Sequence, residues 1–197
     1  MKMKRLTEAA EMVFAFNKYV YHPELGLYQH AQFTDKPAKL PFWSRGNGWA
    51  LWAVTNILSE LPKNHPLYKK LLKHYREHVE GITAWQDKSG LWHNLLNVPE
   101  SYLETSGTAI FTLCIARGIM NGWLNGKKYT PTVEKGWAGI ETMIDEQYQV
   151  HGITVGTNGT TDINYYLERP TALNDCHGLF PVIIAAIQVD KLRSMNK

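Results

Sequence analysis

Apolar residues recur at helical spacing in six stretches of the chain. These stretches lie at residues 5–20, 47–60, 66–80, 106–120, 131–145 and 174–192. In the first of them an apolar residue returns every three or four positions, at Leu6, Ala9, Met12, Val13 and Phe16, which is the spacing of one helix face. No stretch alternates apolar and polar residues as a strand does, and only short runs such as GITVGT could pair as a minor ribbon. The pattern predicts an all-α fold.

The connections between these predicted helices alternate between long and short. The first and second helices, the third and fourth, and the fifth and sixth are separated by roughly 25 to 30 residues, beyond the about 12–15 residues above which structureless loops are uncommon and usually functional. The other two connections, LPKNH and NGWLNGKKY, are short. In antiparallel helical hairpins this alternation places every long loop at one end, which we take as the candidate functional face.

Three of the helices begin with a similar motif. A charged residue precedes a glycine by three positions in RGNG at 45–48, ETSG at 104–107 and DCHG at 175–178. The three glycines are 59 and then 71 residues apart, which fits a repeated unit of two helices and one long loop. Hairpins stacked in a ring would bury apolar inner helices and direct their N-termini at the long-loop face. Unpaired N–H groups there would favour an anionic ligand.

Composition and charge exclude several classes of protein. The chain has 197 residues, 44% of them hydrophobic, and a net charge of +3 from scattered acidic and basic residues. This balance argues against a nucleic-acid or anionic-membrane partner. The longest apolar runs, such as FPVIIAAIQV, are about half of the roughly 20 residues needed to cross a bilayer. We expect a single domain over residues 1–197.

Cysteine usage and the first residues bear on compartment and cofactors. Cys114 and Cys176 lie in unrelated segments without zinc-ligand spacing, which favours buried thiols. The first twelve residues, MKMKRLTEAAEM, are too charged for a signal peptide. His74 and His78 are one helical turn apart, but no histidine and carboxylate set has convincing metal spacing. We therefore expect a cytoplasmic protein with no metal and no cofactor.

Aromatic residues are unusually many, and they gather in the predicted loops. The chain holds 7 Trp and 10 Tyr, and exposed rings in loops suit a sugar site. Arg45 could clamp a carboxylate through its planar guanidinium, or form a structural salt bridge to Glu104 or Asp175. Trp49 could present a wall to a sugar, whereas Trp52 is expected in the core. Further residues expected at the mouth of the pocket are Trp43, Asn47, Glu104, Asp175 and His177.

Several of these motifs together resemble a known enzyme family. WSRGNGW at 43–49, QDKSGLWHNLL at 86–96, SYLETSGTAIF at 101–111 and NDCHG at 174–178 are similar to the unsaturated glucuronyl and rhamnogalacturonyl hydrolases of glycoside hydrolase families 88 and 105. The similarity is closest to family 105 and runs in order across nearly the whole chain. It implies an (α/α)6 barrel, of which three helical hairpins would make about half a toroid.

The resemblance also implies a reaction. In these enzymes an aspartate protonates the C4=C5 bond of a 4,5-unsaturated uronic acid, water adds at C5, and the hemiketal collapses to release the sugar from an oligosaccharide, as in pectin degradation. His30, Arg45 and Trp49 match the family's substrate-binding positions. The family's catalytic aspartates lie in the N-terminal half of the barrel, which this chain does not match. The catalytic residue is thus expected to be absent, and the chain alone is expected to be inactive.

Two other interpretations remain open at this stage. The chain could be a non-catalytic carbohydrate-binding or inactive remnant of the family, or a helical-repeat interaction domain, although the loop aromatics argue against the latter. Half a ring would expose apolar inner helices along two edges, so we expect a homo-oligomer or an aggregation-prone chain.

Overall fold

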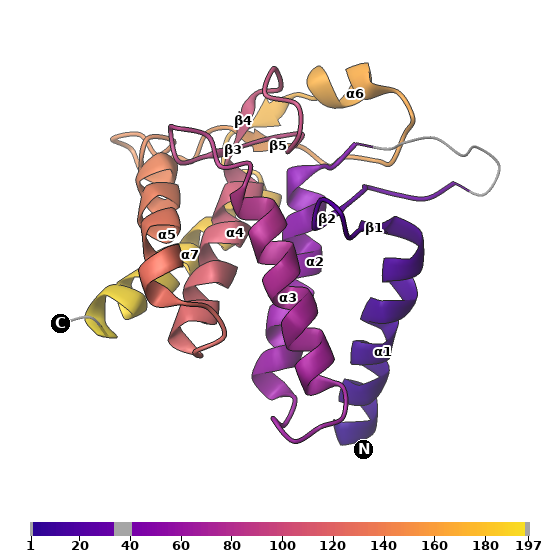
Figure 1. The fold of residues 1–197 in the computed structure, drawn as a ribbon. Coiled ribbons are helices and arrows are strands. Elements are labelled where there is room, and N and C mark those ends of the chain that lie inside the picture. Colours follow the sequence, from indigo (N-terminus) through magenta and orange to yellow (C-terminus); the bar gives the residue numbers. More distant parts are fainter. Residues whose placement is uncertain (1, 34–40, 196–197) are drawn as a thin grey trace.

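The structure, a computed structural model, describes residues 2–33 and 41–195 (Figure 1). Part of the loop between His30 and Arg45 therefore lies outside the described residues. The helices are α1 (Lys2–Val20), α2 (Ser44–Glu60), α3 (Tyr68–Thr83), α4 (Thr105–Met120), α5 (Gly126–Glu141), α6 (Ile163–Leu167) and α7 (Cys176–Met195). The strands are β1 (Tyr21–His22), β2 (Leu27–Tyr28), β3 (Trp92–His93), β4 (Leu103–Glu104), β5 (Ile153–Thr154) and β6 (Thr171–Ala172).

The six helices predicted from apolar spacing are all present, and the all-α fold is confirmed. The start of α2 differs from the prediction, because the helix begins at Ser44 and so includes the RGNG motif in its first turns. The side-chain amide of Asn47 donates to the carbonyl oxygen of Trp43, at 3.0 Å, and reinforces this first turn. Helix α5 also begins earlier than predicted, where the side chain of Asn125 accepts a hydrogen bond from the N–H of Lys128.

The helices form antiparallel hairpins around a central helix. α4 packs against α2 on one side, against α7 on the other, and against α5. Figure 1 shows α1 at one side of the array, with α7 and α5 toward the other. Every residue from Thr105 to Ala116 in α4 is buried, so α4 is one of the inner helices that the sequence predicts.

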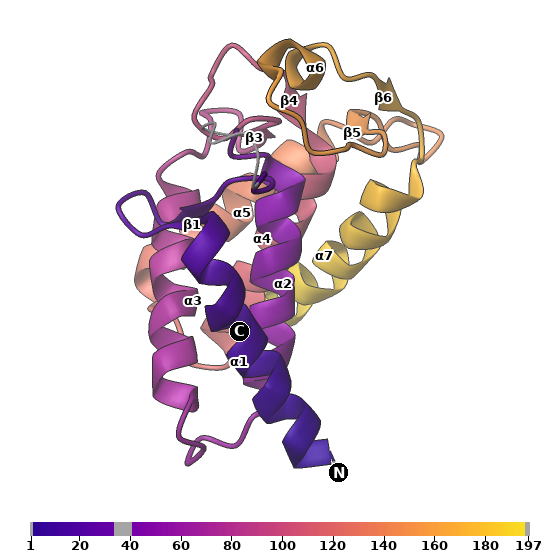
Figure 2. The ribbon, with the colours of Figure 1, turned by 90° about the vertical axis from the view of Figure 1, so that its right-hand side faces the viewer.

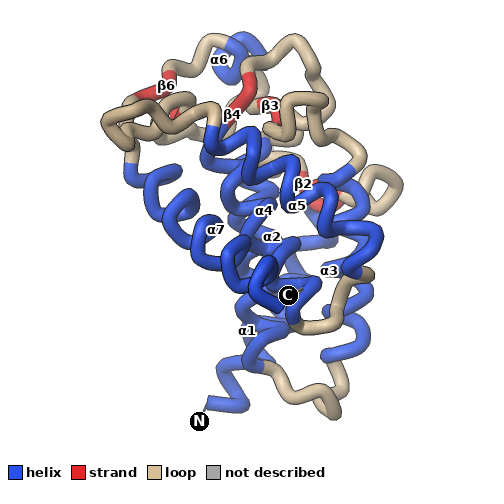
Figure 3. Tube along the Cα trace, turned by 90° about the vertical axis from the view of Figure 1, so that its left-hand side faces the viewer, coloured by secondary structure: helices blue, strands red, loops and turns tan. Residues whose placement is uncertain are grey.

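The long loops meet at one end of the array and the short turns at the other, as predicted (Figures 1 and 3). Each long loop contains one antiparallel two-stranded ribbon: β1 with β2, β3 with β4, and β5 with β6. The ribbon expected in GITVGT is the β5–β6 pair. The short helix α6 lies in the third long loop and was not predicted.

Two of the repeated glycines lie where α2 and α4 approach each other too closely for a larger residue. A Cβ on Gly107 of α4 would lie 2.6 Å from Oγ of Ser44, and one on Gly48 of α2 would lie 3.1 Å from Ile110. α2 and α4 therefore pack at their loop ends through glycines that leave no room for a side chain. Among the described residues, no helix is long and apolar enough to cross a membrane.

Candidate functional site

Arg45 is buried beneath the long loops, with only 1% of its surface exposed. Its Nη1 donates to Oγ of Ser106, at 3.1 Å, and to the carbonyl oxygen of Thr154, while Nη2 donates to the carbonyl oxygen of Val155, at 2.8 Å. Its Nε is buried without a hydrogen-bond partner in the described part of the chain. Arg45 thus joins α2 to the start of α4 and to the third long loop.

Glu104 supplies the opposite charge in this buried layer. Its Oε1 lies 4.0 Å from Nη1 of Arg45, and both side chains are almost fully inaccessible. The carboxylate also caps α4 by accepting from the backbone N–H groups of Ser106 and Gly107, and it accepts from the N–H of Thr154, at 3.0 Å. The salt bridge considered from the sequence is present, and it is part of a wider hydrogen-bond network.

Asn47 is also buried rather than placed at the mouth of the pocket, with 1% of its surface exposed. Its side chain accepts from the N–H of Tyr28 and donates to the carbonyl oxygen of Tyr28, both at 2.8 Å. Nε2 of His78 lies 3.2 Å from its Oδ1. Asn47 therefore attaches β2 to α2 and α3, and the expectation that it lines the mouth is wrong because these partners occupy its polar atoms.

His30 lies at the loop face, half-buried beside two aromatic rings. Its Nδ1 is 2.7 Å from the hydroxyl of Tyr166, and its ring centroid is 4.4 Å from that of Trp43. Burial and the charge of Arg45 lower the pKa of His30 to about 4, so the ring is neutral at pH 7. A neutral imidazole can donate one hydrogen bond and accept another.

Asn94 links the three long loops and is not predicted as a site residue by its sequence context. Its Oδ1 accepts from the indole N–H of Trp43, at 3.1 Å, and from the hydroxyl of Thr154, while its amide donates to the carbonyl oxygen of Tyr166, at 2.9 Å. The only signal in the sequence is a polar amide between Trp92-His93 and Leu95-Leu96. A buried amide needs such partners, but the sequence does not say which.

Trp49 extends from α2 one helical turn beyond Arg45. Its indole is 42% exposed and stacks on that of Trp52, with centroids 5.6 Å apart and planes inclined by 6°. Trp52 is partly buried against the core, as expected. The outer indole offers an aromatic face to a ligand, and the inner one holds it in place.

The start of α7 carries an oriented histidine and carboxylate. Oδ1 of Asp175 accepts from the backbone N–H of His177 and lies 2.6 Å from Nδ1 of the His177 ring. Burial raises the pKa of Asp175, but its hydrogen bonds with His177 outweigh this and leave it lowered. The ring of His177 is partly exposed and lies over Gly156, which follows the loop segment held by Arg45.

The predicted site residues therefore divide into two layers. Trp43, Arg45, Asn47 and Glu104 form a buried layer, and His30, Trp49, Asp175 and His177 reach the surface above or beside it. The expected anion site at free helix N-termini is wrong for α4 and α7, because Glu104 and Asp175 already accept from their first N–H groups.

Among the described residues, one set of side chains could hold a metal ion. Asp175, Cys176 and His177 have ligand atoms within 4.8 Å of one another. These three neighbours span one short piece of chain, and a structural zinc site takes four ligands in a tetrahedral arrangement. The set alone does not provide such a site.

The helical hairpins, with their long loops together at one end, have the arrangement that the resemblance to (α/α)6 glycosidases predicts. Comparison with known proteins places the chain more specifically: residues 2–193 match the model of Glycosyl Hydrolase Family 88, and the chain belongs to that family. It is 33% identical over 141 residues to an unsaturated 3S-rhamnoglycuronyl hydrolase of Alteromonas sp. (strain LOR), an alignment covering 68% of this chain and 34% of the relative. It is 32% identical over 150 residues to the unsaturated rhamnogalacturonyl hydrolase YesR of Bacillus subtilis, covering 75% and 42%.

A solved structure gives the same result for the fold. A possible member of the GH105 family from Salmonella enterica serovar Paratyphi A superposes with a TM-score of 0.87 at 25% identity, covering 98% of this chain and 51% of that one. The chain thus spans about half or less of these relatives. The 24.9 kDa protein in the picA locus of Rhizobium radiobacter is closer in length: it is 27% identical over 190 residues, covering 81% of this chain and 80% of that protein.

Proposed function

We propose that this chain is part of an unsaturated uronyl hydrolase of the rhamnogalacturonyl type. The reaction hydrates the C4=C5 bond of a terminal 4,5-unsaturated uronic acid and so releases that sugar from an oligosaccharide. Support comes from family membership and from the activities for which two relatives are named. The observation that carries the proposal here is the single connected cluster of His30, Trp43, Arg45 and Tyr166 beneath the loop face.

In this proposal the surface layer contacts the sugar and the buried layer positions it. Trp49 supplies a flat wall for the sugar ring, and neutral His30 hydrogen-bonds a hydroxyl or the carboxylate. Arg45 adds positive charge close to the site. Because its Nη atoms already donate to Ser106 and to the carbonyls of residues 154 and 155, its main proposed role is to hold the third long loop under the substrate.

The described carboxylates at the loop face do not have the properties of the proton donor that this reaction needs. A general acid at neutral pH needs a raised pKa. The pKa of Asp175 is lowered as described above, and hydrogen bonds from Ser89 lower that of Asp87. Both carboxylate oxygens of Glu104 accept from N–H groups of α4. We therefore propose that this chain binds substrate and that turnover needs residues from outside it. We also propose that the substrates are pectin-derived oligosaccharides and that the reaction takes place in the cytoplasm.

The test separates binding from turnover. Titration calorimetry should detect binding of an unsaturated rhamnogalacturonan disaccharide, and no binding of the same disaccharide after reduction of its C=C bond. Trp49→Ala should weaken binding at least tenfold, whereas Tyr148→Ala, at an exposed aromatic residue of another loop, should leave it unchanged. Equal affinity for both disaccharides would contradict the proposal.

Turnover is followed by loss of the ultraviolet absorbance of the C=C bond. No turnover together with Trp49-dependent binding is the expected result for the purified chain. Family-like turnover by the chain alone would contradict the assignment of the proton donor to other residues. The alternative, a carbohydrate-binding remnant, predicts binding of saturated and unsaturated sugars alike.

A further inference from the structure

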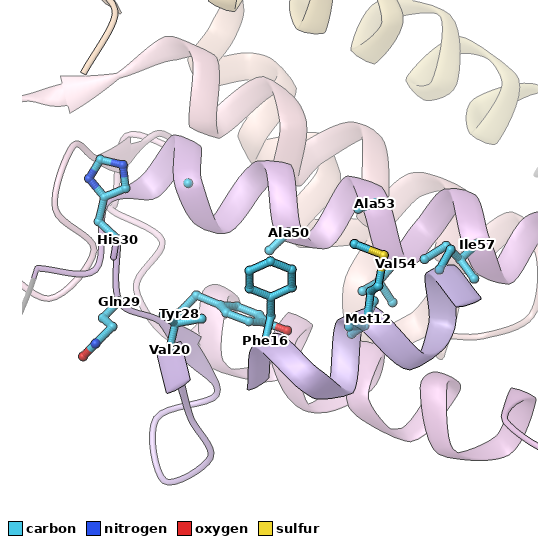
Figure 4. Close-up of a pocket in the computed structure, with 13 residues that line it drawn as sticks. Met12, Phe16, Val20, Tyr28, Gln29, His30, Ala50, Ala53, Val54 and Ile57 are labelled. Atoms are coloured by element: carbon cyan, nitrogen blue, oxygen red, sulfur yellow. The ribbon is translucent and has the colours of Figure 1, made fainter. Parts of the chain in front are cut away.

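One edge of the helix array is an apolar groove between α1 and α2. The groove has a volume of about 420 Å³. Its walls include Met12, Val13 and Phe16 of α1 and Ala50, Ala53 and Ile57 of α2 (Figure 4). Polar residues line it chiefly at the loop end, where Gln29 and His30 lie. A charged sugar needs convergent polar groups, whereas this lining suits the apolar face of a helix.

The opposite edge of the array is an apolar face of α7. Phe180, Ile183 and Ile187 are 61%, 50% and 48% exposed. Their spacing of three and four residues places them on one side of the helix. The other side of α7 carries Ala185 and Val189, which are buried in the core. The exposed stripe therefore points away from α4, out of the array.

The packing inside the chain indicates what fits the groove. α2 packs against both α3 and α4, and α4 packs against both α5 and α7. Each of these inner helices therefore contacts the outer helix and the inner helix that follow it in the chain. α2 is the first inner helix of this series, and no described inner helix packs against α2 on the side of the α1–α2 groove. α7 is the inner helix with a free apolar face, so its stripe has the shape and chemistry that the groove requires.

We propose that two copies of this chain associate with α7 of each copy packed into the α1–α2 groove of the other. A two-fold axis parallel to the helices makes the two contacts equivalent and leaves neither edge exposed. It also keeps both loop faces at the same end.

This association completes the candidate site. His30 lies at the loop end of the groove. α7 begins at the loop face (Figure 2), directly after Asp175 and with His177 in its first turn. Because inner helices run in the same direction from the loop face, packing α7 into the groove brings the partner's His177 near His30. Each site then draws residues from both copies. The association itself does not depend on the proposed activity.

The mass of the purified chain in solution is the first test. Light scattering coupled to size-exclusion chromatography should give twice the chain mass of 22.5 kDa at micromolar concentration. A mass of one chain across that range would overturn the proposal, and would leave the groove to some other occupant. A mass greater than that of two chains would also overturn it, because each copy would then contact two different partners instead of forming a closed two-fold dimer.

Two edge variants test the arrangement. Ile183→Asp places a charge on the α7 stripe, and Ala53→Lys places one in the groove; both positions are exposed in the single chain, so helical circular dichroism should be retained. Each variant alone should dissociate at least tenfold more readily. An equimolar mixture should regain the mass of two chains, because the mixed pair keeps one unaltered contact and brings opposite charges together in the other.

A variant outside both edges serves as the control for these two. Tyr148→Asp, at a residue that is 88% exposed outside both edges, should retain the mass of two chains. Dissociation by Ile183→Asp but not by Ala53→Lys would indicate an α7-to-α7 contact and overturn the proposal. Failure of the mixture to reassociate would overturn it as well.

Discussion

Nδ1 of His30 lies 2.7 Å from the hydroxyl of Tyr166, although the two residues are 136 positions apart in the chain. The same hydroxyl oxygen accepts a hydrogen bond from the backbone N–H of Thr160, at 3.2 Å. We predict that the phenol donates its hydrogen to Nδ1 of His30, so that the imidazole proton is on Nε2. The first and third long loops are thereby joined through one histidine.

Replacing Tyr166 by Phe should disturb this histidine. The variant loses the donor to Nδ1 and leaves the N–H of Thr160 without its partner, so we expect the free energy of unfolding to fall by about 1–2 kcal/mol. The nitrogen chemical shifts of His30 at pH 7 should report the Nε2–H tautomer in the parent and a mixture in the variant. A parent spectrum dominated by Nδ1–H would contradict the assignment. Tyr165→Phe, at the adjacent position, is the matched control for the tautomer.

Removing the charge of Arg45 should cost more than removing a surface charge. Arg45→Met leaves Glu104 as a buried carboxylate without its cationic neighbour and frees the carbonyl oxygens of Thr154 and Val155. We expect a loss of about 3–5 kcal/mol in the free energy of unfolding, measured by urea denaturation. Arg193→Met breaks an exposed ion pair with Glu134 and should cost less than about 1 kcal/mol.

The double variant Arg45→Met with Glu104→Gln should lose less than the sum of the two single variants. The reason is that it no longer leaves a buried charge unpaired. Strict additivity would show that the two side chains are not coupled.

Adding a methyl group at Gly107 should separate α2 from α4. The new Cβ would lie 2.6 Å from Oγ and 2.9 Å from Cβ of Ser44, so the helices must shift. We expect a destabilisation of about 1–3 kcal/mol. Gly126→Ala is the control, since its Cβ would come no closer than 3.4 Å to Ile119. Equal stability of the two variants would contradict the close packing of the two helices.

Stability should decline with acid between about pH 6.5 and 4. Burial lowers the pKa of His74 to about 4, with Glu77 opposing and Lys73 adding to the shift, and it lowers the pKa of His78 still more clearly. Both rings are neutral in the folded chain. Below pH 6.5 the unfolded chain binds protons that the folded chain does not, so the free energy of unfolding rises with pH in this window. Above the window the contribution of the two histidines to stability is complete.

Each buried histidine adds a slope of up to about 1.4 kcal/mol per pH unit. Urea denaturation at a series of pH values measures this slope. His74→Gln keeps a polar group near the hydroxyl of Tyr28, which lies 2.7 Å from Nε2 of His74, and should reduce the slope. A flat profile of the parent between pH 6.5 and 4 would contradict the burial of neutral histidines.

The candidate site was only partly predictable because its buried layer depends on distant partners. The repeated motifs indicate Arg45 and Glu104, and a salt bridge between them is one of the two roles that the sequence allows for Arg45. Asn47 was expected at the mouth because it stands beside Gly48 at an apparent helix start. Its actual partners, Tyr28 and His78, come from other elements. Nothing in the local sequence distinguishes the buried amide of Asn94 from an exposed loop amide, so Asn94 could not be predicted as a site residue.

The sequence by itself determined the helices, the alternation of long and short connections, and the family, because these depend on local apolar spacing and on short motifs. It also determined which residues could carry the chemistry. Only the tertiary structure decided how they are used. Caps and hydrogen bonds at the loop face join residues 50 to 136 positions apart, and burial selects those pairings because an unpaired polar group is costly away from water. RGNG at 45–48 is therefore mainly a packing and anchoring motif, with Trp49 beyond it as the exposed surface.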